Sequence, residues 1–132
     1  MRANECFCIY MIPYKDRRGE HMYVGYTQNV RVVEREQEHV KRDKRRHYAG
    51  PMHVIGIVDR GNPSERWCVL VDGSPLDIKR KWPDHAHALK TQKDAMAAER
   101  FVKRQSKWVK KQAYKKGEPA GQFLEALHQI ED

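Results

Sequence analysis

The sequence predicts a single α+β domain, residues 1–132, with a small, mostly antiparallel sheet of three strands and flanking helices. Two apolar, β-branched segments lie close together near the N-terminus, separated by a polar stretch of hairpin length. Downstream, apolar residues recur at the three- and four-residue steps of a helix. A chain of 132 residues is too short for two self-sufficient cores, so we expect one.

The N-terminal segments predict two adjacent antiparallel strands. Residues 6–12 (CFCIYMI) are apolar, β-branched and aromatic, which favours a strand buried on both faces, and Pro13 predicts its end. Residues 21–27 (HMYVGYT) predict the second strand. The segment between them, PYKDRRGE, contains Pro and Gly and is typical of a hairpin connection.

An amphipathic helix is expected directly after the second strand. Val30, Val33, Gln37 and Val40 recur at helical spacing and predict its core face, with Asn29 as the capping residue. A third strand is expected at residues 52–58 (MHVIGIV). The segment RWCVLV, followed by Asp-Gly and SPLDIKR, predicts a further hairpin in the middle of the chain, at a sheet edge because of its proline.

The last part of the chain predicts C-terminal helices within residues 92–131. Thr91 and Asp94 have the spacing of a capping box, and no Gly or Pro interrupts the following helix before Gly117. A short terminal helix follows, with apolar residues on one side: Phe123, Leu124, Leu127 and Ile130.

Charge composition makes nucleic acid the leading partner. The chain has 26 Lys and Arg against 18 Asp and Glu, a formal charge of +8. It contains no apolar run long enough to span a bilayer and no signal sequence at its start, so we expect a soluble, intracellular protein, cytoplasmic or in the nucleoid or nucleus. Three cysteines cannot all pair, which favours free thiols; Cys6 and Cys8 are interpreted as small buried side chains, with metal ligation as the alternative.

An ordered set of residues carries a family resemblance. Cys8-Ile9-Tyr10 on the first strand and Tyr23-Val24-Gly25 on the second are followed by Thr27, a helix bearing Arg and His, and a distant acidic helix. This set resembles the GIY-YIG nuclease family over about residues 6–110, with residues 60–90 as a possible insertion. The resemblance implies the fold of that family and a divalent-metal-dependent endonuclease that hydrolyses DNA with Mg²⁺ or Mn²⁺.

The same resemblance implies catalytic roles for Tyr10, Tyr23, Arg35 and His39. The tyrosines would orient or deprotonate the attacking water if the hairpin register places them on one face; the alternative is ordinary sheet packing. Arg35 would bind phosphate, although it lies about two residues farther from the second strand than in the family, which makes Arg31 its rival. His39 would orient the nucleophile or contact phosphate, or be an ordinary surface histidine.

Glu99 corresponds to the family's metal ligand. A hard cation can be held by one carboxylate together with waters and substrate phosphate. The alternative is a simple ion pair with Lys103, four residues on. Some family members also use an Asn after this helix, which the chain lacks, so Gln105 or Gln112 would have to substitute.

Basic residues cluster in two runs, and the second contains Trp108 and Tyr114, aromatic residues that could stack on unpaired bases. For Trp108, the core side of the amphipathic helix is favoured over stacking. The residues expected to contact nucleic acid are Arg31, Lys41, Arg42, Lys44, Arg45, Arg46, Lys103, Arg104, Lys107, Lys110 and Lys111. RNA stays open beside DNA, and the oligomeric state is not predicted. The alternative functions are an inactive nucleic-acid-binding module on the same fold and an RNA-associated basic protein.

Overall fold

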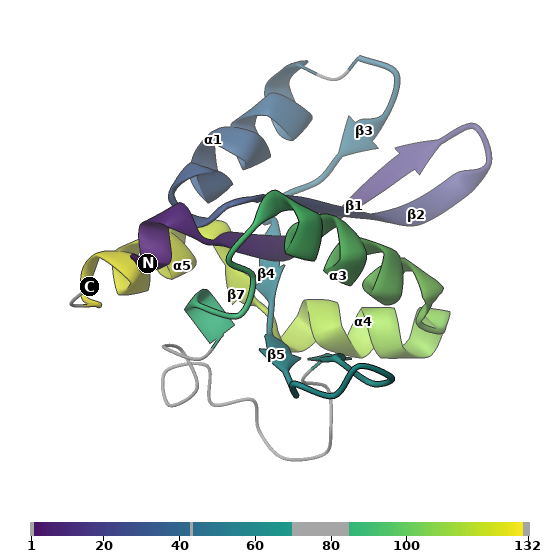
Figure 1. Ribbon diagram of the computed structural model, residues 1–132. Coiled ribbons are helices and arrows are strands. Elements are labelled where there is room, and N and C mark those ends of the chain that lie inside the picture. The colour runs from purple at the N-terminus through teal and green to yellow at the C-terminus, as the bar shows by residue number, and fades with distance from the viewer. Residues whose placement is uncertain (1, 43, 70–84, 131–132) are drawn as a thin grey trace.

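The computed structural model describes residues 2–42, 44–69 and 85–130 (Figure 1). Helices and antiparallel sheets together confirm the predicted α+β class. Strands β1 (Phe7–Asp16) and β2 (Gly19–Gln28) form the antiparallel hairpin that the sequence predicts. Within the described ranges, no helix combines the length and the apolarity needed to cross a bilayer.

The main sheet has five strands where three were predicted. Its order is β2-β1-β4-β7, and all of its pairs are antiparallel, with β4 at His53–Ile55 and β7 at Glu118–Pro119. A further strand, β3 (His47–Tyr48), pairs with the other end of β1. Both unpredicted strands are two residues long, too short to show the alternation by which a strand is identified in a sequence.

The expected third strand is divided at Gly56. Its first half is β4, and its second half is β5 (Ile57–Asp59), which leaves the main sheet and pairs with β6 (Trp67–Val69) in a separate two-stranded sheet. A hairpin therefore forms in the middle of the chain, but β6 pairs with the strand before it. The partner that the sequence suggested, residues 74–80, lies outside the described residues.

Pro13 does not end the first strand, contrary to expectation. β1 continues for three residues to Asp16. Pro13 lies between the residues paired with β4, which end at Met11, and those paired with β3, which begin at Tyr14. Proline lacks a backbone donor, and it is tolerated here because the hydrogen-bonded ladder on that side of β1 is interrupted.

β1 is buried on both faces, as predicted, and separates two apolar cores. The helices are α1 (Val32–Gln37), α3 (Gln92–Arg104), α4 (Lys107–Lys116) and α5 (Ala120–His128). Cys8, Tyr10 and Ile12 face the core shared with α1 and α5. Ile9 and Met11 face the core shared with α3 and α4. The sheet thus lies between two helical layers (Figure 1).

The helical segment after β2 buries a different face from the predicted one. It runs through a 3₁₀ turn η2 (Asn29–Arg31), α1 and a π-helical turn η3 (Glu38–Arg42). Val30 and Val40 are 45% and 44% exposed, whereas Val32 and His39 are buried. The 3₁₀ turn has fewer than 3.6 residues per turn and the π-helical turn has more. A regular helical period therefore cannot describe the segment.

Asn29 does not cap this helix. Its side chain is buried, and its Nδ2 donates to the backbone oxygens of Ala3 (2.7 Å) and Ala86 (2.9 Å). The N-cap position of α1 is Arg31, and it makes no capping side-chain hydrogen bond. Asn29 therefore joins the N-terminal segment to the residues just before α3.

The long C-terminal helix is divided by a capping serine. Thr91 begins α3 as predicted, since its hydroxyl accepts from the backbone N–H of Asp94 at 3.1 Å. The helix was expected to continue to Gly117, but Ser106 begins α4 by accepting from the N–H of Val109 at 3.3 Å. A serine hydroxyl can replace helical hydrogen bonds in this way, which explains the break.

Two further expectations are confirmed. α5 forms the terminal helix and buries Phe123 and Leu127. All three cysteines are free thiols; Cys6 and Cys8 are buried, and burial raises the pKa of the Cys8 thiol. Cys8 therefore acts as a small apolar side chain, whereas the Cys6 thiol also donates to the backbone oxygen of Arg2 at 3.5 Å.

His85 makes folding sensitive to acid. Burial lowers its pKa from 6.5 to about 4, and its Nδ1 accepts from the backbone N–H of Ile57 at 3.2 Å. Because the unfolded chain binds this proton more readily, stability is fully present above pH 6.5 and falls as the pH approaches 4. We expect the free energy of unfolding in urea to drop on the order of 2 kcal/mol through this window.

The matched variants are His85→Gln and His128→Gln, the second at the exposed end of α5. His85→Gln should lose most of this pH dependence, and His128→Gln should keep it. An unchanged pH dependence in His85→Gln would contradict the assignment.

Candidate functional site

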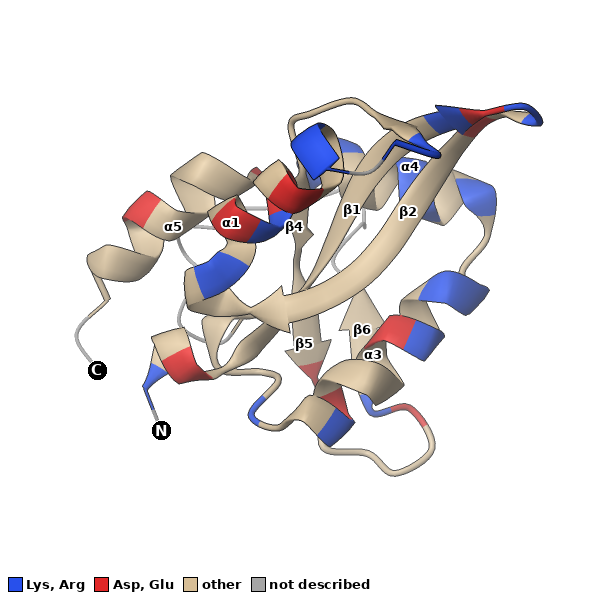
Figure 2. Cartoon of the chain, turned by 90° about the horizontal axis from the view of Figure 1, so that it is seen from above, with Lys and Arg blue, Asp and Glu red and all other residues tan. Residues whose placement is uncertain are grey.

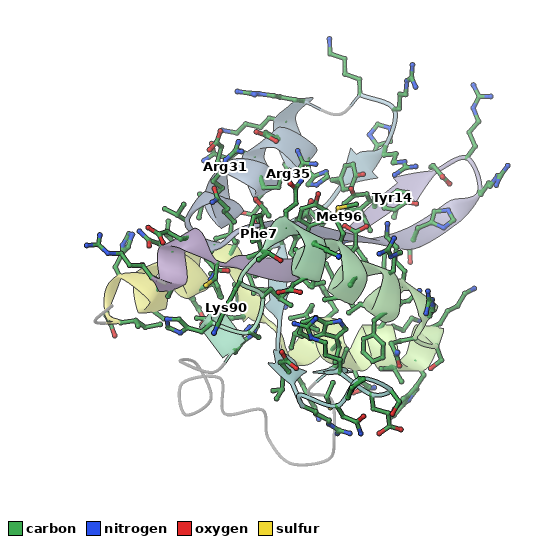
Figure 3. All side chains as sticks on the ribbon, in the orientation of Figure 1. Phe7, Tyr14, Arg31, Arg35, Lys90 and Met96 are labelled. Carbon is green, nitrogen blue, oxygen red and sulfur yellow. The ribbon has the colours of Figure 1, made fainter. Side chains whose placement is uncertain are left out.

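A pocket of about 440 Å³ lies beside β2, the strand at the edge of the main sheet. Residues from β1, β2, α3 and the helical segment after β2 line it. The residues expected from the sequence that line it are Tyr10, Tyr23, Arg31, Arg35 and Glu99. In Figure 3, Arg31 at the N-cap of α1 and Arg35 within α1 lie on the same helical segment, and Phe7 of β1 also lines the pocket.

Tyr10 and Tyr23 lie on one face of the hairpin, as the sequence analysis required. The register pairs Tyr10 with Gly25 and Ile12 with Tyr23, so the two tyrosines are diagonal neighbours. Their ring centroids are 6.1 Å apart. The phenol groups therefore approach the pocket from two adjacent strands.

The hydroxyl of Tyr10 is the centre of the site. Its side chain is fully buried, Arg35 Nε donates to the hydroxyl at 3.1 Å, and His39 Nε2 lies 2.8 Å from it. Burial raises the pKa of Tyr10, and the Arg35 guanidinium only partly opposes that effect. Tyr10 is therefore a neutral phenol at neutral pH, held by two partners from the helical segment.

His39 is buried, not an ordinary surface histidine. The π-helical turn η3 directs it inward, where its ring packs against Tyr23 at 4.8 Å and Tyr48 at 4.6 Å between centroids. Tyr48 completes this aromatic cluster and was not predicted from the sequence. It follows a highly charged run and forms a strand of two residues, so no periodic signal marked it.

Both arginines of the pocket are already paired with carboxylates. Arg35 Nη1 donates to Glu38 at 2.6 Å, while Arg31 pairs with Glu34 at 3.2 Å and Glu38 at 3.7 Å. Burial acts to lower the pKa of Arg35, but its hydrogen bonds to Tyr10 and Glu38 outweigh burial and raise it. The hydrogen bond from Arg35 lowers the pKa of Glu38.

Glu38 lines the pocket and is a second residue that the sequence analysis did not single out. Its three-residue spacing from Arg35 on a helix was the available signal. Of the two rival arginines, Arg35 contacts Tyr10 directly, and Arg31 is held at the rim of the pocket by its acidic neighbours.

Glu99 lines the pocket from α3 and also forms the ion pair expected as its alternative role. Its side chain is 18% exposed, and Lys103 Nζ lies 2.8 Å from Oε1. Lys103 is 51% exposed, so the pair is of the weak helical kind, worth about 0.2–0.5 kcal/mol. A cation entering the pocket could displace Lys103 at small cost.

The donor set of the pocket suits a hard divalent cation bound by few protein ligands. Among the described residues, no group of three or more His, Cys, Asp or Glu side chains is placed to hold a metal. Mg²⁺ often binds through one carboxylate, with waters and substrate phosphate completing its shell. The Glu99 carboxylate beside open space fits that mode.

The glutamines suggested as substitutes for the family's Asn do not line the pocket. Gln105 caps the end of α3 and donates to the backbone oxygen of Phe101, and Gln112 lies on α4. Gln92, at the start of α3, lines the pocket instead, and its side chain donates to the Tyr26 hydroxyl at 3.1 Å. The pocket thus has an amide that the sequence analysis overlooked.

The predicted basic residues divide into three groups. Arg31 lines the pocket and Lys103 contacts Glu99, whereas Lys107, Lys110 and Lys111 line a separate groove. The remaining predicted residues are exposed: Lys41, Arg42, Lys44, Arg45, Arg46 and Arg104. Figures 1 and 2 together show that these segments, the tip of the β1–β2 hairpin and α4 gather toward one end of the molecule.

No protein-family model, curated protein or solved structure matches this chain.

Gly25 provides a test of the geometry of the site. A Cβ at this position would lie 2.5 Å from the Tyr10 hydroxyl oxygen and 2.8 Å from a ring carbon of Tyr23. Gly25→Ala should push the Tyr10 ring away from β2 and lower the thermal midpoint of unfolding, because overpacking a core typically costs about 1–3 kcal/mol.

The matched control is Gly121→Ala, where a Cβ meets nothing within 4 Å. That variant should unfold at the wild-type temperature or above it, since alanine favours the helix. Equal midpoints for Gly25→Ala and wild type would contradict the close packing of Tyr10 on Gly25.

Proposed function

We propose that the chain is a divalent-metal-dependent endonuclease of the GIY-YIG type that hydrolyses phosphodiester bonds in DNA. The observation that supports this proposal is the meeting of Tyr10, Tyr23, Arg35 and Glu99 at one pocket, together with His39 on the Tyr10 hydroxyl. Phosphodiester hydrolysis needs a deprotonated water, a cation for the developing phosphoryl charge, and help for the leaving oxygen.

Tyr10 and His39 are suited to move the proton of the attacking water. Arg35 can only donate to the Tyr10 hydroxyl oxygen, and in the His39 tautomer whose Nε2 carries no proton the hydroxyl donates to that nitrogen. As water attacks phosphorus, Tyr10 takes a proton from it and passes its own to His39. The relay fits a phenol whose pKa is raised by burial, because no free phenolate is required.

Arg35 stabilises the phosphoryl oxygens in this proposal, and Arg31 assists from the rim of the pocket. A guanidinium presents a planar fork that matches phosphate oxygens. Both arginines must exchange a carboxylate partner for phosphate, and Glu38 is the partner they share. Tyr23, whose ring centroid lies 6.1 Å from that of Tyr10, orients the water in this proposal.

Glu99 is the residue that would hold Mg²⁺ or Mn²⁺, which would supply charge neutralisation at the phosphate and the leaving oxygen. Glu99 lines the same pocket as the two arginines, so its ligand would share their substrate phosphate. The proposed contacts are to phosphate, which RNA shares with DNA, so RNA is a second substrate to test.

The proposal is tested with supercoiled plasmid and Mg²⁺ or Mn²⁺. Wild-type protein should nick or linearise the plasmid, and Tyr10→Phe and Glu99→Gln should each lower the cleavage rate by about 100-fold or more. Glu125→Gln, on the exposed face of α5, serves as the matched carboxylate control and should cut at the wild-type rate. No cleavage by wild type, or full activity in Glu99→Gln, would refute the function.

Lys103 should compete with the cation for Glu99. Lys103→Met removes both the ion pair and a positive charge, so the cation concentration for half-maximal binding should fall about twofold or more. Tb³⁺ luminescence, excited through nearby tyrosines, measures this binding without catalysis. Lys93→Met, an exposed residue in the first turn of α3, is the control and should bind Tb³⁺ like wild type; weaker binding in Lys103→Met would contradict the competition.

The second candidate is a nucleic-acid-binding module without catalysis. The observation that favours it is the pairing of Arg35 and Arg31 with Glu38 and Glu34, which leaves neither guanidinium free in the pocket. Salt-sensitive binding of DNA without metal-stimulated cutting would support this candidate over the enzyme.

A further inference from the structure

A second groove lies apart from the pocket of Tyr10. It has a volume of about 670 Å³ and is bounded by the β1–β2 hairpin on one side and by α4 on the other. Three lysines of α4 line it, Lys107, Lys110 and Lys111, and the hairpin contributes Lys15. None of the residues that line the pocket of Tyr10 also lines this groove.

The charge of the groove is mostly uncompensated. Among the described residues, Lys107, Lys110 and Lys111 form no ion pair with a carboxylate. Glu20 is the acidic residue of the lining, and it pairs with Lys15 at 3.3 Å. The sequence has no Asp or Glu from residue 100 to residue 117. The groove therefore favours an anionic ligand with several charges.

The spacing of these lysines suits one strand of a nucleic acid. From Lys107 to Lys111 the helix rises about 6 Å, so these long side chains can reach phosphates that follow one another along a strand. Contacts of this kind neutralise phosphates without reading sequence.

Trp108 follows Lys107 on α4, outside the lining of the groove, and is 65% exposed. The sequence analysis favoured a core position for it, and that interpretation is wrong. On α4, Trp108 directly follows Lys107, and Lys111 lies one turn further along on the adjoining surface. An accessible indole among cations is the combination by which proteins stack unpaired bases while holding the backbone.

We propose that α4 binds an unpaired nucleic-acid strand, with Lys107, Lys110 and Lys111 on its phosphates and Trp108 stacked on a base. The proposal rests on the proposed function for the identity of the ligand and adds a substrate class: nucleic acid with a single-stranded segment. Bases inside a duplex are stacked on one another and do not present a free face to an indole, so pairing would exclude this contact.

Fluorescence anisotropy with labelled oligo(dT), and with a blunt duplex of equal length, tests the proposal in EDTA, where cleavage plays no part. Trp108→Ala should weaken oligo(dT) binding by about tenfold and duplex binding much less, and Trp108→Phe should retain oligo(dT) affinity. Because Trp108 is exposed, neither change should disturb the fold, and circular dichroism checks that point.

The lysines are tested by a triple variant, Lys107→Gln with Lys110→Gln and Lys111→Gln. It should bind oligo(dT) more weakly and reduce the slope of log affinity against log salt by about 2. The charge-matched control changes exposed Arg2, Arg60 and Lys90 to Gln, all outside the groove, and should keep a slope closer to wild type.

Two results would overturn the inference: wild-type oligo(dT) affinity in Trp108→Ala, or equal losses in the triple variant and its control. A failure of the proposed function looks different. Wild type would then leave plasmid uncut in Mg²⁺ and Mn²⁺ while oligo(dT) binding still depended on Trp108. If plasmid is cut but oligo(dT) binding does not depend on Trp108, the nuclease proposal is retained and the α4 proposal is rejected.

Discussion

The packing of Tyr10 on Gly25 is the constraint on which the site depends. Tyr10 belongs to the core between the sheet and the layer of α1 and α5, yet its hydroxyl reaches the pocket at the edge of the sheet. A side chain on the paired residue would occupy the place of that hydroxyl. The same contact therefore fixes the register of the hairpin, the position of the helical segment that carries Arg35 and His39, and the geometry of the pocket.

The parts of the fold that long apolar segments determine were predictable from the sequence. The apolar pattern predicted that β1 is buried on both faces and pairs with β2, but it left the register of that pairing open. The register in the structure places Tyr10 and Tyr23 on one face. By contrast, β3 and β7 are held by their neighbours and not by their own composition, and β4 separates from β5 at a single glycine.

The candidate site was predicted in its residues but not in its local geometry. Arg35, His39 and Glu99 were selected by spacing and resemblance, and the structure brings Arg35 and Glu99 to one pocket and His39 to the Tyr10 hydroxyl. The burial of His39 depends on the π-helical turn, which regular periodicity cannot describe. Tyr48 packs on His39 and Gln92 lines the pocket only because of the tertiary fold. Their neighbours in the sequence do not indicate either role.

The carboxylate of Glu38 offsets much of the positive charge of the pocket. Glu38 already forms ion pairs with Arg35 and Arg31. An anion that binds these arginines must displace the Glu38 carboxylate, so the net gain in Coulomb energy is small. In the proposed functions, tight binding of nucleic acid therefore comes from surfaces whose positive charge is not paired, such as α4. Binding and catalysis would then lie in separate regions, so that a point mutation could strengthen one and leave the other unchanged.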